Sequence, residues 1–173
     1  MFHTDDPQVR ELLLNGSFGL ERESLRVTQD GYLAQTPHPF PGDEHIVRDF
    51  SENQVEVNTP VVDSPAQAVA VLEHYDDVIQ KKLAEQGELL WPFSNPPYIR
   101  SAIDVPVAQF EGADAHKTAY REYLDERYGR YKMTFSGIHF NYSFADELLK
   151  ADFAASGEED FDAYKDRLYL DLA

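Results

Sequence analysis

The chain has 173 residues, and its 32 Asp and Glu residues against 15 Lys and Arg give a formal net charge of −17. Hydrophobic residues make up 42%, enough for a packed core, which excludes a wholly disordered chain. The acidic balance argues against nucleic acid and anionic membranes as partners, and no apolar run is long enough to span a bilayer. The length suggests that residues 1–173 form one domain or the N-terminal part of a larger one, and the absence of cysteine and of a secretory signal fits a cytoplasmic protein.

The first third of the chain predicts a short helix followed by strands. Asp6-Pro7 is a helix start, with a capping side chain before a proline at the first helical position. Alternating apolar and polar residues then indicate strands with one buried face, separated by segments rich in Pro and Gly. The expected strands are 17–27, 45–50 and 52–59, the expected turn is Gln29-Asp30-Gly31, and the expected loop is 36–44.

The remainder predicts helices and two further strands. Ser64-Pro65 begins a helix with apolar residues at spacings of three and four, and Gly87 ends it. A second helix is expected from Asp114 to Gly129. Residues 145–173 are expected to be helical, and their apolar stripe has no stop signal, so we expect the chain to be cut before its natural end. The expected strands are 89–93, which is predicted to be buried, and 133–144.

Three of these strands place functional side chains on one face and apolar side chains on the other. If the strands are neighbours in an antiparallel sheet, several carboxylates and an imidazole meet on one surface. Carboxylates within ~4–6 Å repel each other unless one is protonated or a cation lies between them. The candidates are Glu21 and Glu23; Glu52, Gln54, Glu56 and Asn58; and His139, Asn141 and Ser143, with Asp49 just before the second set.

These residue types leave two interpretations open. Oxygen ligands suit Mg²⁺, often with phosphate oxygens completing its shell, and an imidazole among carboxylates is also compatible with Mn²⁺ or Zn²⁺. However, any antiparallel sheet with one wet face shows such alternation, and a lone strand histidine such as His139 is more often structural. In the same way, Arg121 and Arg127 could bind a substrate carboxylate or phosphate, or could form ion pairs on a helix surface.

Five motifs, in order and in register from about residue 10 to 145, resemble bacterial glutamate–cysteine ligases. The segment Val105–Phe110 is similar to the bifunctional enzymes that fuse this ligase to a glutathione synthetase. The five motifs are Phe18-Gly-Leu-Glu-Arg-Glu-Ser-Leu-Arg-Val27, Asp49-Phe-Ser-Glu-Asn-Gln-Val-Glu-Val-Asn-Thr-Pro60, Leu90-Trp-Pro-Phe-Ser94, Tyr120-Arg-Glu-Tyr-Leu124 with Arg127-Tyr-Gly129, and Ser136-Gly-Ile-His-Phe-Asn-Tyr-Ser-Phe144.

The resemblance implies a fold, a reaction and a set of site residues. The fold is α+β, with a curved antiparallel sheet and flanking helices similar to glutamine synthetase, here incomplete. The reaction joins the γ-carboxyl of L-glutamate to the amine of L-cysteine through an acyl phosphate, using ATP and Mg²⁺ (or Mn²⁺), as the first step of glutathione biosynthesis. By position, the metal ligands are Glu21, Glu23, Asp49, Glu56 and His139, the cysteine pocket is Phe50, Tyr120 and Leu124, and Arg121 and Asn141 are catalytic candidates.

The chain departs from this family in its length. Family members are much longer, so the isolated chain is expected to hold only part of the site and to be inactive alone. The alternative interpretation is a non-catalytic, acidic metal-binding domain. An ordinary acidic surface without any site is the third interpretation.

Overall fold

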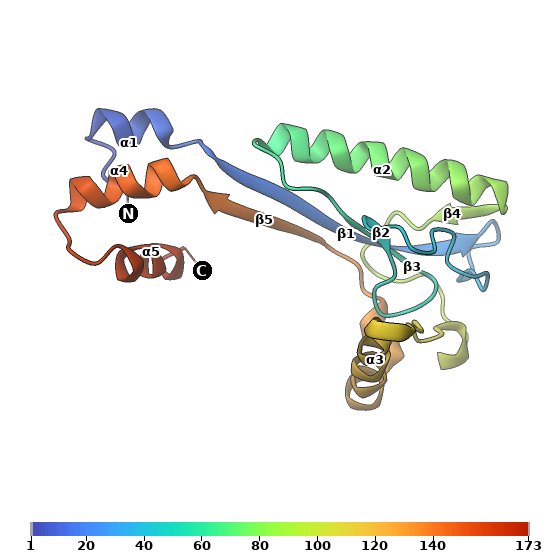
Figure 1. Ribbon diagram of the computed structural model, residues 1–173. Coiled ribbons are helices and arrows are strands. Elements are labelled where there is room, and N and C mark those ends of the chain that lie inside the picture. The colour runs from blue at the N-terminus through green and yellow to red at the C-terminus, as the bar shows by residue number, and fades with distance from the viewer. Residues whose placement is uncertain (1, 173) are drawn as a thin grey trace.

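The computed structural model describes residues 2–172 and has an α+β fold built on an open antiparallel sheet (Figure 1). The sheet order is β2-β3-β1-β4, and β5 also pairs with β1. The expected α+β class is therefore confirmed. The strands are β1 (Gly16–Thr28), β2 (Ile46–Val47), β3 (Gln54–Asn58), β4 (Glu88–Leu90) and β5 (Ile138–Phe144), and the helices are α1 (Pro7–Leu12), α2 (Pro65–Glu85), α3 (Ala115–Tyr128), α4 (Asp146–Ser156) and α5 (Phe161–Leu170), with 3₁₀ turns at Ala102–Asp104, Gly112–Asp114 and Arg130–Thr134.

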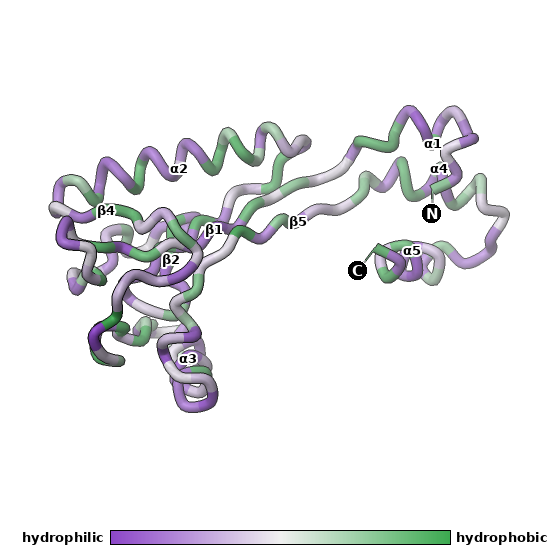
Figure 2. The backbone as a smooth tube through the Cα atoms, turned by 180° about the vertical axis from the view of Figure 1, so that it is seen from behind, coloured by the Kyte–Doolittle hydropathy of each residue, from purple (hydrophilic) through white to green (hydrophobic). Residues whose placement is uncertain are grey.

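Helix α2 covers one face of the sheet. It begins at Ser64, whose side chain accepts a hydrogen bond from the Gln67 backbone N–H, and most of its predicted apolar stripe is buried. Figure 2 shows hydrophobic and hydrophilic residues alternating along this helix. Burial of this stripe closes that face to solvent and leaves the opposite face for a site. The buried cluster consists of Ala68, Leu72, Ile79 and Leu83 from α2 and Leu20, Ile46, Val55 and Val57 from the strands.

The opposite face of β1 is divided between a polar half and an apolar half. Glu21 and Glu23 lie on this face, and the same side of the strand continues into the buried Leu25 and Val27. These two side chains belong to a second core cluster, which also holds Phe50. The polar half is therefore closed at the end where β1 reaches Leu25.

The long strands β1 and β5 form a two-stranded ribbon that leads to a small helical cluster of α1, α4 and α5 (Figure 1). Asp152 is fully buried in this cluster and accepts the backbone N–H of His3 at 2.7 Å as well as the Tyr164 hydroxyl. The predicted helical character after residue 145 is confirmed, and it is divided between two helices because Gly157 adopts a left-handed conformation (φ 72°) and separates α4 from α5.

A buried ion pair joins β1 to β4. Arg26 Nη1 donates to Glu88 Oε2 at 2.7 Å, and both side chains are almost fully buried. The same guanidinium donates to the backbone carbonyls of Thr36 and Glu52, at 2.8 Å each. One charged side chain therefore holds together the strand, the loop after it and the turn that precedes β3.

Four predicted strands are shorter than expected, and the one expected at 52–59 is reduced to β3. The strand expected at 133–144 begins at Ile138, because Arg130–Thr134 forms a 3₁₀ turn, and the strand expected at 45–50 is reduced to β2. The strand expected at 89–93 is β4, and it is not a buried apolar strand. Its first residue, Glu88, points inward to the Arg26 guanidinium, and the next side chain, Leu89, is 52% exposed. No helix within residues 2–172 combines the length and apolar character needed to cross a membrane.

Candidate functional site

The register of the sheet brings the predicted polar residues onto one surface. Glu21 of β1 lies opposite Asn58 of β3 and also opposite His139 of β5. Glu23 lies opposite Glu56 of β3. Because directly paired residues in an antiparallel sheet point to the same side, these side chains share one face. We call this surface the acidic face; it consists of Glu21, Glu23, Glu56, Asn58, His139 and Asn141.

Hydrogen bonds and an ion pair hold two of these carboxylates in place. Glu23 Oε2 accepts the backbone N–H of Gly137 at 3.1 Å, and His139 Nε2 lies 3.5 Å from Glu23 Oε1. Asn141 Nδ2 donates to Glu21 Oε1 at 2.9 Å. Strand β5 therefore orients both glutamates of β1 from across the ladder.

Asp49 approaches the acidic face from the segment between β2 and β3. Its carboxylate lies 3.8 Å from Arg121 Nη2, and Arg121 Nε donates to the Asp49 backbone carbonyl. These contacts connect α3 to the segment that carries Asp49. Arg121, a catalytic candidate by the family resemblance, therefore lies beside a residue that the resemblance gives as a metal ligand.

Burial and mutual repulsion perturb three carboxylates of the site. Burial raises the pKa of Glu23, and the nearby Asp49 raises this pKa further. Burial also raises the pKa of Glu56, with additional repulsion from Asp49, Glu23 and Glu21. Burial likewise raises the pKa of Asp49, which the Arg121 guanidinium opposes. The ionised carboxylates therefore repel one another, and a bound cation would relieve this repulsion.

These side chains suit a hard divalent ion that keeps water or phosphate ligands better than an ion enclosed by protein ligands alone. Within residues 2–172, no three His, Cys, Asp or Glu side chains are gathered closely enough to enclose one ion. Mg²⁺ commonly binds through one or two carboxylates and completes its octahedron with water and substrate phosphates. Adjacent carboxylates spread along an open face, such as Glu21 and Glu23, match that mode of binding.

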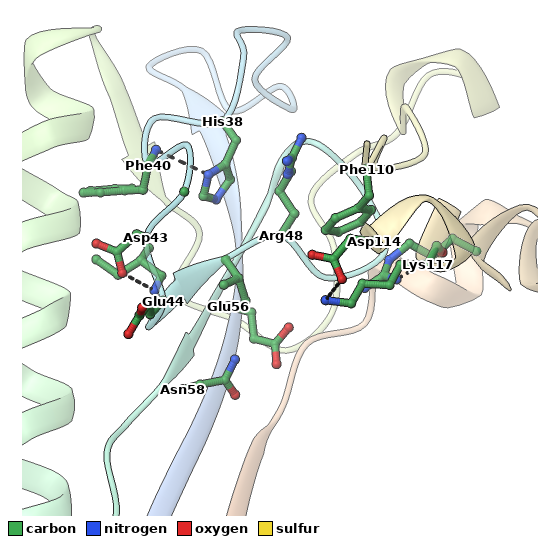
Figure 3. Close-up of a pocket in the computed structure, with 14 residues that line it drawn as sticks. His38, Phe40, Asp43, Glu44, Arg48, Glu56, Asn58, Phe110, Asp114 and Lys117 are labelled. Atoms are coloured by element: carbon green, nitrogen blue, oxygen red, sulfur yellow. Dashed lines mark hydrogen bonds and ion pairs between the residues drawn. The ribbon is translucent and has the colours of Figure 1, made fainter. Parts of the chain in front are cut away.

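A cavity of about 560 Å³ lies beside the acidic face, between the loop before β2 and the N-terminal part of α3 (Figure 3). On one side, Arg48, Lys117 and Arg121 surround the Phe110 ring, with cation-to-centroid distances of 4.9, 5.7 and 4.7 Å. Acidic residues of the loop before β2 line the other side, and Glu56 lies between the two sides. We call this space the charged cavity, and its separated charges suit a ligand with both carboxylate and ammonium groups.

The structure brings together some of the residues predicted for the cysteine pocket and separates another from them. Phe50 is buried, and Leu124 packs against the same core cluster. Tyr120 is 59% exposed on α3. Arg127 does not reach the acidic face; its guanidinium contacts Tyr123 on the surface of α3.

Two residues predicted for the polar face of β3 do not contribute to its exposed surface. Glu52 precedes the strand, and its carboxylate accepts a hydrogen bond from Arg48 Nη1 at 2.9 Å. Gln54 is fully buried, where its side chain accepts the Ser51 backbone N–H and donates to the Met133 carbonyl. The predicted polar face of β3 is therefore accessible to solvent only at Glu56 and Asn58, because the chain after Ser51 turns into the core.

Sequence reasoning missed the basic side of the charged cavity. Arg48, Phe110 and Lys117 come from three separate segments, and no local spacing connects them. The one available signal was the scarcity of cations in a chain with a net charge of −17.

The fold and the site define an α+β protein whose antiparallel sheet is covered by a helix on one face and carries an acidic, ligand-accessible surface on the other. The family model for glutamate-cysteine ligase matches residues 2–173, and the chain belongs to this family.

Relatives with assigned names agree with this membership. The glutathione biosynthesis bifunctional protein of Listeria monocytogenes serotype 4b is 42% identical over 176 residues, which cover 98% of this chain and 23% of that protein. The glutamate–cysteine ligase of Clostridium acetobutylicum is 42% identical over 145 residues, which cover 80% of this chain and 30% of that protein. The chain therefore spans about a quarter of the length of these relatives.

The fold of this chain is similar to two solved structures. The crystal structure of a bifunctional glutathione synthetase from Pasteurella multocida has a TM-score of 0.86 at 36% sequence identity, covering 94% of this chain and 22% of that chain. The structure of a glutamate–cysteine ligase from Francisella tularensis in complex with AMP has a TM-score of 0.76 at 31% identity, covering 85% of this chain and 30% of that chain.

Proposed function

We propose that the chain carries the metal-binding and amino-acid-binding part of an ATP-dependent glutamate–cysteine ligase. The reaction joins the γ-carboxyl of L-glutamate to the amine of L-cysteine in the cytoplasm, as the first step of glutathione biosynthesis. The observation that carries the proposal is the sheet register, in which β1 with Glu21 and Glu23 lies between β3, which carries Glu56, and β5, which carries His139. Membership of the ligase family and the AMP in the Francisella tularensis relative support it.

The reaction begins with two anions that must meet. A γ-carboxylate oxygen of glutamate attacks the terminal phosphorus of ATP, and ADP leaves with the electrons of the broken P–O bond. The cysteine amine then attacks the acyl carbon, phosphate leaves, and the nitrogen loses a proton. Divalent ions, when bound, supply the neutralisation of phosphate charge that this chemistry needs. Glu21, Glu23, Asp49, Glu56 and His139 would hold Mg²⁺ or Mn²⁺ at this position.

The residues of the chain itself would bind and orient the amino acids. Arg121 and Lys117 can attract a substrate carboxylate into the charged cavity, while Glu56 and the acidic loop residues can attract an ammonium group. Phe50 and Leu124 provide an apolar surface next to Asp49, and an apolar wall suits a thiol better than a hydroxyl. Asn141 orients Glu21 by donating to its carboxylate.

Titration calorimetry with Mg²⁺ and Mn²⁺, in the presence and absence of ATP, tests the proposal. Binding of metal together with nucleotide supports the ligase function, and binding of metal without nucleotide supports the alternative, a non-catalytic metal-binding domain. The absence of any binding contradicts both. We expect no coupled release of ADP from this chain alone, since it spans about a quarter of its relatives. Release that depends on both glutamate and cysteine would contradict that expectation.

A further inference from the structure

The aromatic ring of Phe110 connects three cationic side chains at the basic side of the charged cavity. The ring is half-buried and lies in the segment before α3. Arg48 reaches it from the segment between β2 and β3, and Lys117 and Arg121 reach it from α3. Figure 3 shows the ring between Arg48 and Lys117. Three of the chain's 15 Lys and Arg residues therefore meet at one ring, in a protein whose net charge is −17.

The electrostatics of this arrangement give the ring a specific role. Cations gathered in a small space repel one another, and the negative potential of an aromatic face offsets part of that repulsion. The two guanidinium carbons lie almost equally far from the ring centre, at 4.9 Å for Arg48 and 4.7 Å for Arg121. A guanidinium over an aromatic face keeps its N–H groups for other partners. The ring can therefore hold both arginines in place without using the donors that bind an anion.

Hydrogen bonds fix the segment that carries the ring to both neighbouring segments. The Phe110 backbone N–H donates to Thr118 Oγ1 of α3 at 2.8 Å. The Gln109 backbone N–H donates to Glu52 Oε1 at 2.9 Å, and the same oxygen accepts a hydrogen bond from Arg48 Nη1 at 2.9 Å. The ring is therefore held at a defined place relative to Arg48 and to α3, as a positioning residue must be.

The charges of the cavity are complementary to one amino acid in one orientation. An α-carbon in the cavity can turn its carboxylate to the cations around Phe110 and its ammonium group to Asp43 and Glu44 on the acidic side. Its side chain then extends toward Glu56, which lies between the two sides and belongs to the acidic face. A side chain that ends in a carboxylate suits this place, since divalent ions there would neutralise it. L-Glutamate has this pattern of charges, and L-cysteine does not.

We propose that Phe110 is a positioning residue for L-glutamate, and that its ring holds Arg48 and Arg121 in the arrangement that binds the α-carboxylate. The inference rests on the proposed function, because it takes the charged cavity to bind an amino acid of the ligase reaction. It makes an uncharged side chain, which forms no hydrogen bond to the substrate, responsible for the preference for an α-carboxylate.

The test compares two ligands that differ in the α-carboxylate. Titration calorimetry measures binding of L-glutamate and of γ-aminobutyrate to the 173-residue chain in the presence of Mn²⁺ and ATP. We expect Phe110→Leu, which removes the ring and keeps an apolar side chain, to weaken L-glutamate binding about tenfold and to change γ-aminobutyrate binding by less than about twofold. The control is Tyr32→Leu, which removes a ring 4.7 Å from the Arg100 guanidinium, at an exposed position that does not line the cavity. Neither ligand should respond to the control.

A fluorinated ring separates the electrostatic role of Phe110 from its packing. Replacement of Phe110 by trifluorophenylalanine nearly preserves the shape of the ring and weakens the negative potential of its face. We expect this variant to bind L-glutamate about threefold more weakly than the unchanged chain and to keep the same Tm. A ring that acts only through packing would leave L-glutamate binding unchanged in the fluorinated variant.

Each outcome decides a different part of the argument. If Phe110→Leu leaves L-glutamate binding unchanged, or weakens both ligands alike, the role of Phe110 is wrong and the proposed function stands. If only the fluorinated variant binds like the unchanged chain, the ring acts through packing and the inference is also wrong. If the unchanged chain binds Mn²⁺ and ATP but not L-glutamate, the assignment of the charged cavity to L-glutamate is wrong. If the unchanged chain binds none of them, the proposed function itself is overturned, and the inference falls with it.

Discussion

The buried ion pair between Arg26 and Glu88 predicts a large effect from a small substitution. Glu88→Gln keeps the size of the side chain and its ability to accept hydrogen bonds, and removes its charge. The Arg26 guanidinium, which is fully buried, then has no counter-ion at the 2.7 Å position. Breaking a buried pair in this way costs about 3–5 kcal/mol. For a chain of this size, each kcal/mol lowers Tm by about 2–4 °C, so the expected loss is about 6–20 °C.

The assay is a thermal melt followed by circular dichroism at neutral pH, with a matched exposed pair as control. Glu85→Gln removes the partner of Lys82 Nζ, which lies 2.8 Å from Glu85 Oε2 on the surface of α2. An exposed pair contributes about 0–1 kcal/mol, so Tm should fall by less than about 4 °C. Equal losses in the two variants would show that burial of the charge is not the cause.

A double variant and a binding measurement separate the charge effect from other causes. Arg26→Met combined with Glu88→Leu replaces the pair by apolar side chains and should recover part of the stability that Glu88→Gln loses, because the double variant removes the buried charge but also the hydrogen bonds to the Thr36 and Glu52 carbonyls. Glu88→Gln should also weaken Mn²⁺ binding, although Glu88 is not on the acidic face. The reason is that Arg26 Nη2 donates to the Glu52 carbonyl at 2.8 Å, in the turn that follows Asp49.

Three further predictions concern the acidic face and the core. Glu23→Gln and His139→Ala should each weaken Mn²⁺ binding in calorimetry, and unchanged affinity in both variants would remove the proposed metal site. Burial raises the pKa of Glu56, so its ionised form destabilises the folded chain above the folded-state pKa, and this effect disappears below the ordinary pKa of glutamate. Glu56→Gln should therefore raise Tm at neutral pH and leave Tm unchanged in acid. An equal rise of Tm at both pH values would contradict this cause. Leu83→Ala, at a fully buried position, should lower the free energy of unfolding by about 2–5 kcal/mol in urea titration, and a loss well below 1 kcal/mol would show that α2 does not pack as described.

Strand alternation was enough to predict which side chains share a face, but it could not predict which strands are neighbours. The alternation in residues 17–27 places Glu21 and Glu23 together, because the period of two is a property of the extended backbone. The pairing of Glu21 with His139 joins positions more than a hundred residues apart, and it depends on how α2 and the long loops return the chain. Motif resemblance supplied this adjacency where local spacing could not.

Other features were missed because a charged residue in a strand is usually assigned to solvent. Arg26 lies in β1 and Glu88 is the first residue of β4. Both side chains are buried because they neutralise each other. The exposed apolar residues of β5 show the opposite deviation. Ile138 and Phe140 follow the predicted alternation and are more than half exposed, since no helix among residues 2–172 covers that end of the sheet as α2 covers β3.

The position of the acidic face depends on the core beneath it. A slip of one residue between β1 and β3 would turn Glu21 and Glu23 toward α2 and turn Leu20 toward solvent. The packing of Leu20 against α2 opposes such a slip, and so does the ion pair of Arg22 with Asp76 on the side of β1 that faces α2. Mutual repulsion among the ionised carboxylates acts against the fold, as their raised pKa values indicate. The apolar contacts of α2 therefore supply the stability that allows like charges to remain side by side, and substitutions in that core should weaken metal binding without touching a ligand.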